Sequence, residues 1–232
     1  MLTVGSLFSG IGGIDLGLER AGMTVKWHSE IDPFACRVLK KHWPHVPNLG
    51  NITEIDWSAV PHVDVIAGGY PCQPFSLAGK RAGENDPRHL WPYFRDAISA
   101  LRPRYALMEN VRGHLSMGGL SVIGDLTALG YNAEWRIISA ASVGANHRRD
   151  RLVVVAYPDR KGLQRAEREV YQTRNRARFT GRGWEWWQTE PEVGRVANGV
   201  PARMDRLRGL GNAVVPQVAE VVGRLIMEDA SR

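Results

Sequence analysis

Cys72 stands in an unusual setting for a thiol. It is one of only two cysteines, and it follows the apolar run HVDVIAGGY in a loop where Pro71 and Pro74 restrict the chain. A cysteine that only fills a core usually lies among apolar neighbours inside a helix or strand. Basic residues in the same loop favour the reactive thiolate: Lys80, Arg81 and Arg88. We therefore expect Cys72 to be a nucleophile and not an inert packing residue.

A carboxyl group is expected beside this thiol. Glu109 ends the apolar run YALME, and Cys72 follows the preceding apolar run at residues 63–68. Open α/β sheets form their ligand crevice at the carboxyl ends of the strands, so both side chains should project into one crevice. A thiol next to a carboxyl group that holds a proton suits attack on an electron-poor ring. The plainer alternative is a capping or surface carboxylate.

A glycine-rich turn lies between the first apolar run and the first helical pattern, in LFSGIGGIDLGLERAG. Gly10 and Gly12 allow a ligand to approach the backbone, and Gly13 allows close packing where the helix starts. Glu30 lies 20 residues beyond Gly10, where a carboxylate accepts hydrogen bonds from ribose hydroxyls. No Lys-Ser/Thr pair follows the glycines, so the pattern favours an adenosine-containing cofactor without a triphosphate.

Alternating strand and helix patterns must position these residues. Near-continuous apolar runs predict strands at 2–7, 23–29, 63–68, 105–109, 132–139 and 151–157. Helical patterns lie between them, at 14–22, 33–43, 90–101 and 119–130, and a further one covers 216–230. This alternation predicts an α/β fold with a doubly wound, mostly parallel sheet that is covered on both faces.

The net charge of +6 comes from the C-terminal part of the chain. Residues 1–146 hold 13 Lys+Arg and 13 Asp+Glu, whereas residues 147–232 hold 17 and 11, and 17 − 11 gives +6. We therefore divide the 232 residues into a catalytic and cofactor-binding domain at 1–157, a short basic and aromatic insert at 158–195, and a C-terminal return at 196–232. An Arg-rich stretch with interleaved aromatics suits contacts to a polyanion, although a solvated surface has the same composition.

Composition also bounds the location of the chain. No stretch approaches the roughly 18 apolar residues that span a membrane. The N-terminus MLTVGSLFSG lacks the pattern of a secretory signal, and two cysteines cannot build a disulfide framework. We expect a cytoplasmic protein without a membrane partner.

Five ordered motifs together resemble the cytosine-carbon-5 DNA methyltransferase family of bacteria and phages. LFSGIGG resembles the cofactor loop of this family, GGYPCQPFS its nucleophile loop and ENV its acid motif. NHRRDRL resembles its arginine motif and GLGNAVVPQ its C-terminal block. The likeness covers residues 3–157 and 194–225. It implies a Rossmann-like, S-adenosylmethionine-dependent methyltransferase core, with the basic insert as a reduced target-recognition region.

The resemblance also implies roles for individual residues. A cytosine is flipped out of duplex DNA, Cys72 attacks its carbon 6, and Glu109 holds or donates a proton at ring nitrogen 3. Arg149 and Arg151 match the two family arginines, with Arg151 expected on the exocyclic oxygen of the base. S-adenosylmethionine supplies the methyl group, and no metal is expected. The implied cofactor-binding residues are Phe8, Gly10, Gly12, Glu30, Ile31, Asn51, Ile52, Leu90 and Asn212.

Three departures from the family pattern concern specificity more than chemistry. Asn51 stands where the family usually has an acidic residue, and His147 replaces a usual glutamine. The insert is much shorter than the usual target-recognition region. Within it, GWEWWQTEP is interpreted as a small core that holds the insert, and the alternative is a tryptophan that stacks on bases.

Two other functions remain as alternatives. One branch of the family modifies transfer RNA, but its Cys-Phe-Thr signature is absent here. A DNA-binding relative without catalysis is the second alternative, although Cys72, Glu109 and Arg151 are intact. We expect the chain to act as a monomer, with a cognate restriction endonuclease as a candidate partner in the same cell.

Overall fold

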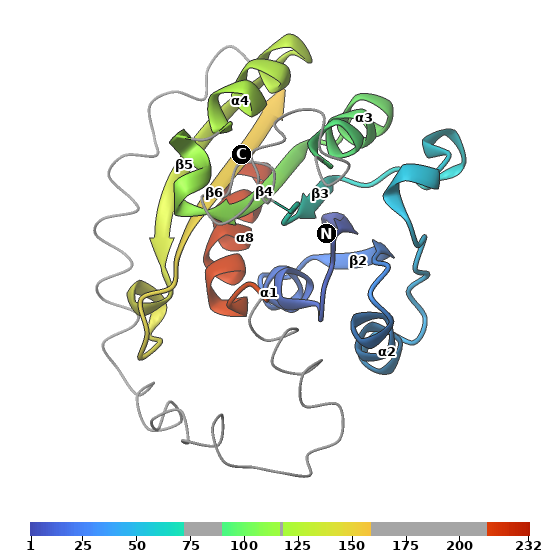
Figure 1. Cartoon of the computed structure of the whole chain (residues 1–232), viewed down its shortest axis with the longest axis horizontal. Helices are drawn as coiled ribbons and strands as arrows, with labels where there is room; N and C mark the ends of the chain where they lie inside the picture. Colours follow the sequence, from blue (N-terminus) through green and yellow to red (C-terminus); the bar gives the residue numbers. More distant parts are fainter. Residues whose placement is uncertain (72–89, 117, 159–212) are drawn as a thin grey trace, which may run out of the picture.

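The chain folds around a six-stranded sheet (Figure 1). The computed structural model describes residues 1–71, 90–116, 118–158 and 213–232. The sheet has the order β2-β1-β3-β4-β6-β5. Its strands are β1 (Thr3–Leu7), β2 (Thr24–Ser29), β3 (Val65–Gly68), β4 (Tyr105–Val111), β5 (Tyr131–Ser139) and β6 (Asp150–Pro158). Strands β2, β1, β3 and β4 pair in parallel, and β6 runs antiparallel to both β4 and β5, which confirms the mostly parallel sheet.

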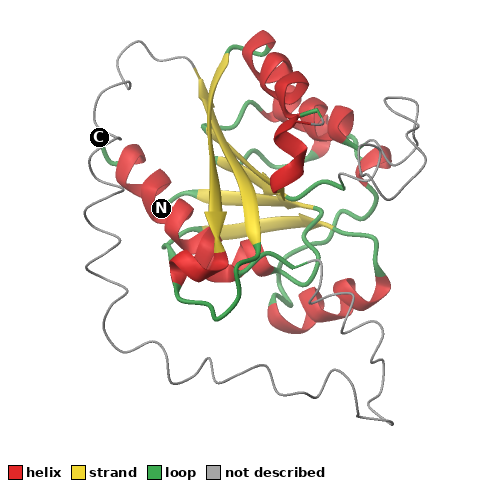
Figure 2. Cartoon of the chain, turned by 60° about the vertical axis from the view of Figure 1, so that its left-hand side comes forward, coloured by secondary structure: helices red, strands yellow, loops and turns green. Residues whose placement is uncertain are grey.

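Helices cover both faces of this sheet (Figure 2). On one face, α1 (Gly13–Arg20) and α8 (Pro216–Ala230) bury Ile14, Leu18 and Val222 against β1 and β3. On the other face, α3 (Trp91–Leu101) and α4 (Gly119–Ala128) bury Phe94 and Leu126. The remaining long helix, α2 (Pro33–His42), follows β2 and begins at Asp32, whose side chain accepts a hydrogen bond from the amide of Ala35.

The predicted elements agree with the structure within a few residues at their ends, and two differences matter. Strand β4 continues past its predicted end at 109, because Asn110 and Val111 pair with Leu152 and Arg151 of β6. Within the described part of the chain, four short 3-10 helices were not predicted: Ile52–Glu54, Trp57–Ala59, Arg112–Ser116 and Ala140–Val143. The predicted insert, from residue 159 onward, and residues 196–212 lie outside the described residues.

Close packing between α1 and α8 joins the two ends of the described chain. Gly17 lies inside α1, and a Cβ atom there would collide with the carbonyl oxygen of Pro216 and lie 2.5 Å from Cβ of Ala219. Gly223 of α8 is similarly close to α1, since its Cβ would lie 2.8 Å from Cβ of Ala21. The absence of side chains at these glycines therefore sets how closely the C-terminal helix approaches the helix after β1.

Substituting two helix-interior glycines tests this packing. We expect Gly17→Ala to lower the free energy of unfolding by about 1–3 kcal/mol, because the new methyl group overfills the contact. Gly124→Ala in α4 is the matched control: no atom lies within 4 Å of its added Cβ, so it should stabilise the fold by about 0.5–1 kcal/mol. Urea unfolding followed by circular dichroism measures both. Equal stability of Gly17→Ala and the parent would contradict the packing.

Candidate active site

The carboxyl ends of three neighbouring strands meet at one edge of the sheet. Leu7 of β1 pairs with Gly68 of β3, and Gly68 pairs with Met108 of β4. Gly69, directly after β3, passes so close to Glu109 that a Cβ atom would lie 2.8 Å from Oε2. The chain that leads to Cys72 therefore starts beside the Glu109 carboxyl group. Cys72 itself lies outside the described residues.

Glu109 is buried and faces a guanidinium group. Its Oε1 lies 2.6 Å from Nε of Arg151, and the two side chains are 12% and 18% exposed. Glu109 pairs with Val153 across β4 and β6, on the face that α1 and α8 cover. Burial raises the pKa of the Glu109 carboxyl, and the positive charges of Arg151 and Arg149 oppose this rise. The group is thus suited to carry a proton at a higher pH than an ordinary glutamate.

Arg149 is held in an unusual backbone conformation next to this pair. Its φ is +34°, a region that L-residues rarely adopt, and its Nη2 donates a hydrogen bond of 2.7 Å to the carbonyl oxygen of Ala213. Burial lowers the pKa of Arg149, the charge of Arg151 lowers it further, and Glu109 raises it. Arg151 thus contacts the Glu109 carboxyl group, and Arg149 adds a second positive charge to the electrostatic surroundings of that carboxyl.

The turn after β1 has the backbone that the glycines predict. Phe8, Gly10 and Gly12 have φ values of +53°, +55° and +83°. Around Gly10 the space is open, since the nearest atom to an added Cβ is 4.0 Å away. At Gly12 the space that a ligand was expected to occupy is filled by protein: an added Cβ would lie 2.5 Å from the Trp43 ring. The amide of Gly12 donates a hydrogen bond to the Ser9 carbonyl oxygen. Gly12 is thus required for packing.

Glu30, at the end of β2, holds this turn through its carboxylate. Its Oε2 accepts a hydrogen bond of 2.7 Å from the amide of Gly10. Its Oε1 accepts from the amides of Ile31 and Asp32, at 2.8 and 2.7 Å. A carboxylate has about four acceptor positions, so further capacity remains for hydroxyl donors. Ile31, the next residue, is 68% exposed.

Other expected cofactor residues lie around the same edge of the sheet. The ring of Phe8 stacks on Phe94 with centroids 6.3 Å apart, and Leu90 is the residue at the N-terminal cap of α3. Asn51 caps the next short helix: its Oδ1 accepts from the amide of Thr53, and its Nδ2 donates to Glu54. Ile52 is 5% exposed and belongs to the core. Asn212 lies outside the described residues.

Sequence reasoning missed a second group of buried polar residues at this edge. Asn110 donates a hydrogen bond of 3.1 Å to the carbonyl oxygen of Tyr70, and the Tyr70 hydroxyl lies 2.6 Å from Nε2 of His114. One signal was available, since Asn110 directly follows Glu109 in the sequence and neighbouring residues in a strand point to opposite faces. No sequence pattern links Tyr70 with His114, which lies 44 residues further along.

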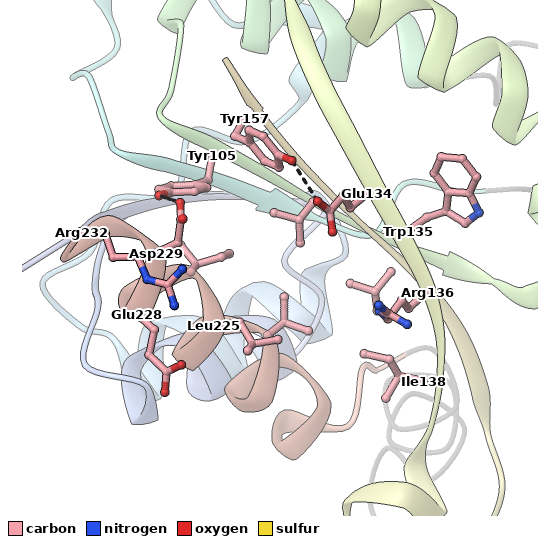
Figure 3. Close-up of a pocket in the computed structure, with 14 residues that line it drawn as sticks. Tyr105, Glu134, Trp135, Arg136, Ile138, Tyr157, Leu225, Glu228, Asp229 and Arg232 are labelled. Carbon is pink, nitrogen blue, oxygen red and sulfur yellow. Dashed lines mark hydrogen bonds between the residues drawn. The ribbon is translucent and has the colours of Figure 1, made fainter. Parts of the chain in front are cut away.

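A separate groove of about 130 Å³ lies between β5, β6 and α8 (Figure 3). Its floor is apolar and includes Ile138 and Val222, and Tyr105 and Tyr157 donate hydrogen bonds to Asp229 and Glu134 at its sides. None of the expected site residues lines it. The candidate site is therefore identified by the converging side chains at the strand ends and not by this groove.

Two features are absent from residues 1–71, 90–116, 118–158 and 213–232. Within these ranges, no group of three His, Cys, Asp or Glu side chains is arranged to hold a metal ion. No helix among the same residues has the length and apolar character needed to cross a membrane.

Comparisons with known proteins find a matching family model and related sequences. The family model for C-5 cytosine-specific DNA methylase matches residues 2–180. The Type II methyltransferase M.Eco47II of Escherichia coli is 40% identical over 162 residues, which cover 66% of this chain and 39% of that protein. M.NgoBI of Neisseria gonorrhoeae is 35% identical over 158 residues, which cover 66% and 50%. The chain thus spans half or less of the length of these relatives.

Solved structures share the fold. DNMT2 of Spodoptera frugiperda matches with a TM-score of 0.61 and 25% identity, over 72% of this chain and 54% of that one. A protein proposed to be a DNA modification methyltransferase, encoded within an Escherichia coli prophage, matches with a TM-score of 0.58 and 28% identity. That match covers 68% of this chain and 47% of the other. The predicted Rossmann-like α/β fold is thereby confirmed.

The raised pKa of Glu109 predicts how Glu109→Gln depends on pH. A carboxyl group with a raised pKa in the folded state contributes stability at low pH and loses it as pH rises through that pKa. Relative to Glu109→Gln, the parent should therefore lose stability above the ordinary glutamate pKa of 4.5. The loss amounts to about 1.4 kcal/mol for each unit by which the pKa is raised.

Urea unfolding of both proteins between pH 4.5 and pH 8 measures this difference. In the variant, Arg151 loses its charged partner, which changes the free energy of unfolding by a constant amount at every pH. The test is therefore how the stability difference between the two proteins changes with pH. If the stability of the parent relative to Glu109→Gln stays constant or increases as pH rises, the pKa of Glu109 is not raised.

Proposed function

The chain belongs to the C-5 cytosine-specific DNA methylase family, and from this premise we propose that it methylates carbon 5 of a cytosine in duplex DNA. Its core is the Rossmann-like fold of S-adenosylmethionine-dependent methyltransferases. The observation that carries the proposal is the buried Glu109 carboxyl, which contacts Arg151 and adjoins Gly69 at the start of the Cys72 loop. This contact at Gly69 supports a carboxyl group that holds a proton where the loop of the proposed nucleophile begins.

The proposed chemistry begins with Cys72. Its thiolate attacks carbon 6 of a flipped-out cytosine, because the ring carbons are unreachable while the base is stacked. Glu109 holds a proton at ring nitrogen 3, which draws electrons through the ring and makes carbon 5 nucleophilic. After carbon 5 is methylated, a base removes its proton and the bond from Cys72 to carbon 6 breaks. Cys72 leaves as the thiolate, and ring nitrogen 3 returns its proton to Glu109.

The two arginines act on the charge that develops in the ring. Arg151 is proposed to bind the exocyclic oxygen of the base, and the contact of its Nε with Glu109 supports this role. Arg149 binds the carbonyl oxygen of Ala213, so it connects this end of β6 with the segment before α8. Preorganised donors of this kind stabilise a transition state without reorganising during the reaction.

The residues after β1 and β2 fit an adenosine-containing cofactor. Open space at Gly10, the carboxylate of Glu30 and the exposed side chain of Ile31 form one surface. When bound there, S-adenosylmethionine supplies the methyl group. We propose that Phe8, Gly10, Gly12, Glu30, Ile31, Asn51, Ile52, Leu90 and Asn212 form its site, with Glu30 on the ribose hydroxyls. Gly12 contributes by shaping the turn, since its own Cβ space is filled by Trp43.

Duplex DNA is the proposed partner, and the basic stretch at 160–182 is proposed to contact its phosphates. The division into a catalytic domain at 1–157, an insert at 158–195 and a return at 196–232 is part of the same proposal. The proposal also includes a monomeric state, a cytoplasmic location and a cognate restriction endonuclease as partner. The chain's Type II relatives motivate the last of these.

Methyl transfer tests the proposed function. Incubation with labelled S-adenosylmethionine and a mixed-sequence duplex should yield 5-methylcytosine. Cys72→Ser should abolish it, and Glu109→Gln should lower the rate about 100-fold or more, because a positioned proton donor is lost. Glu134→Gln is the matched control: this exposed carboxylate on β5 accepts a hydrogen bond from Tyr157, far from the site, and its loss should leave the rate unchanged.

Three outcomes would contradict the proposal. Methylation of transfer RNA in preference to duplex DNA would change the substrate. Salt-dependent DNA binding without methyl transfer by the parent protein would indicate a DNA-binding module. An active Cys72→Ser variant would remove the assigned nucleophile.

A further inference from the structure

Tyr70 is fixed at both its side chain and its backbone, two residues before Cys72. Its side chain is buried, and its hydroxyl lies 2.6 Å from Nε2 of His114, which is also buried. Its carbonyl oxygen accepts a hydrogen bond of 3.1 Å from Nδ2 of Asn110. Both anchors come from one short stretch, since Asn110 ends β4 with Val111 and His114 lies in the 3-10 helix that follows.

The ring of Tyr70 is also enclosed by aromatic side chains. The rings of Trp91 and Phe94, both on α3, lie 5.4 and 6.0 Å away, and the His114 ring packs edge-on at 5.4 Å. Trp91 is itself fixed, because its Nε1 donates a hydrogen bond of 2.6 Å to Asp125 of α4. The remaining void beside Tyr70 and His114 is only about 10 Å³. Hydrogen bonds and packing therefore restrict the same residue.

We propose that Tyr70 and His114 are positioning residues that fix where the Cys72 segment begins, an inference that rests on the proposed function of Cys72. Consecutive Cα atoms are 3.8 Å apart, so the Cα of Cys72 lies within about 7.6 Å of that of Tyr70. Fixing Tyr70 against β4 therefore limits the positions open to the thiol. Pro71, the residue between them, limits those positions further because its ring fixes φ.

Strand β4 connects this anchor with the acid. Glu109 pairs with Val153 on the face of α1 and α8, whereas Asn110 pairs with Leu152 on the face of α3 and α4. Of these two adjacent residues, Glu109 carries the carboxyl group, and Asn110 binds Tyr70 at the start of the Cys72 loop. A shift of β4 would therefore move the Glu109 carboxyl and the backbone anchor of Tyr70 together.

The hydroxyl of Tyr70 is the part of this anchor that can be removed without emptying the core. In Tyr70→Phe the ring contacts to Trp91 and Phe94 remain, but the directional bond to His114 is lost. Tyr131→Phe is the matched control, because Tyr131 is also buried and its hydroxyl donates a hydrogen bond of 2.7 Å to the Pro103 carbonyl, away from the loop. Both variants delete one oxygen and one buried hydrogen bond.

Hydrogen–deuterium exchange of the intact protein is the first measurement. In Tyr70→Phe, the peptide that covers residues 69–76 should exchange about tenfold faster than in the parent, because local opening no longer breaks the buried hydrogen bond. In Tyr131→Phe, the same peptide should exchange as in the parent. Equal exchange in both variants would overturn the proposal.

Covalent trapping is the second measurement. A duplex with 5-fluorocytosine retains the adduct, since fluorine at carbon 5 cannot leave as a proton. Adduct formation should be about tenfold slower in Tyr70→Phe and unchanged in Tyr131→Phe, while both variants bind S-adenosylmethionine and duplex like the parent. His114→Asn should slow adduct formation by a similar factor. The double variant Tyr70→Phe/His114→Asn should be little slower than either single variant, as expected for residues that act as one unit. Additive effects would contradict a shared role.

The two measurements separate this inference from the proposed function. If the parent forms no adduct, the assignment of Cys72 as nucleophile fails, and the exchange data still decide whether Tyr70 fixes the loop. If the parent forms the adduct and Tyr70→Phe forms it at the parent rate, the positioning role fails and the proposed function stands.

Discussion

Parallel pairing of β1, β3 and β4 is the constraint on which the site depends. Parallel strands end at the same edge of a sheet, so residues that follow Leu7, Gly68 and Met108 are neighbours although they are separated by 40 residues or more of sequence. The pairing also explains glycine at position 68, where a Cβ atom would collide with the Leu7 carbonyl oxygen, and at 69, where it would press on Glu109. A close edge of this kind brings together the glycine-rich turn after β1, Gly69 at the start of the Cys72 loop and the Glu109 carboxyl group.

Burial gives Glu109 its chemical character. A charged carboxylate is costly to remove from water unless it is paired, and the contact with Arg151 compensates part of that cost. Desolvation outweighs this compensation in the pKa of Glu109, which stays raised. The same arginine can therefore bind a substrate oxygen without fully ionising its neighbour. Asn110, directed to the opposite face, leaves this balance untouched while it binds Tyr70.

Sequence reasoning predicted most of the fold because buried parallel strands are continuous apolar runs and the helices between them are periodic. The helix at 216–230 was predicted to the residue, whereas β4 was predicted two residues too short, because polar Asn110 hides its pairing with β6. Contacts between side chains of distant elements produce no comparable pattern in the sequence. The Trp43 ring against Gly12 and the Tyr70 hydroxyl on His114 depend on packing that the sequence does not display. The motifs located Glu30, Glu109 and Arg151 but not these supports.

A crystal structure of the protein trapped on a duplex with 5-fluorocytosine, with S-adenosylmethionine present, tests the central claim most directly. The account predicts a bond between the Cys72 sulfur and carbon 6 of an extruded cytosine. It also predicts the Glu109 carboxyl within about 2.6–3.2 Å of ring nitrogen 3. A base bonded to Cys72 with Glu109 directed away from it, or a free Cys72 thiol beside a stacked cytosine, would contradict the account.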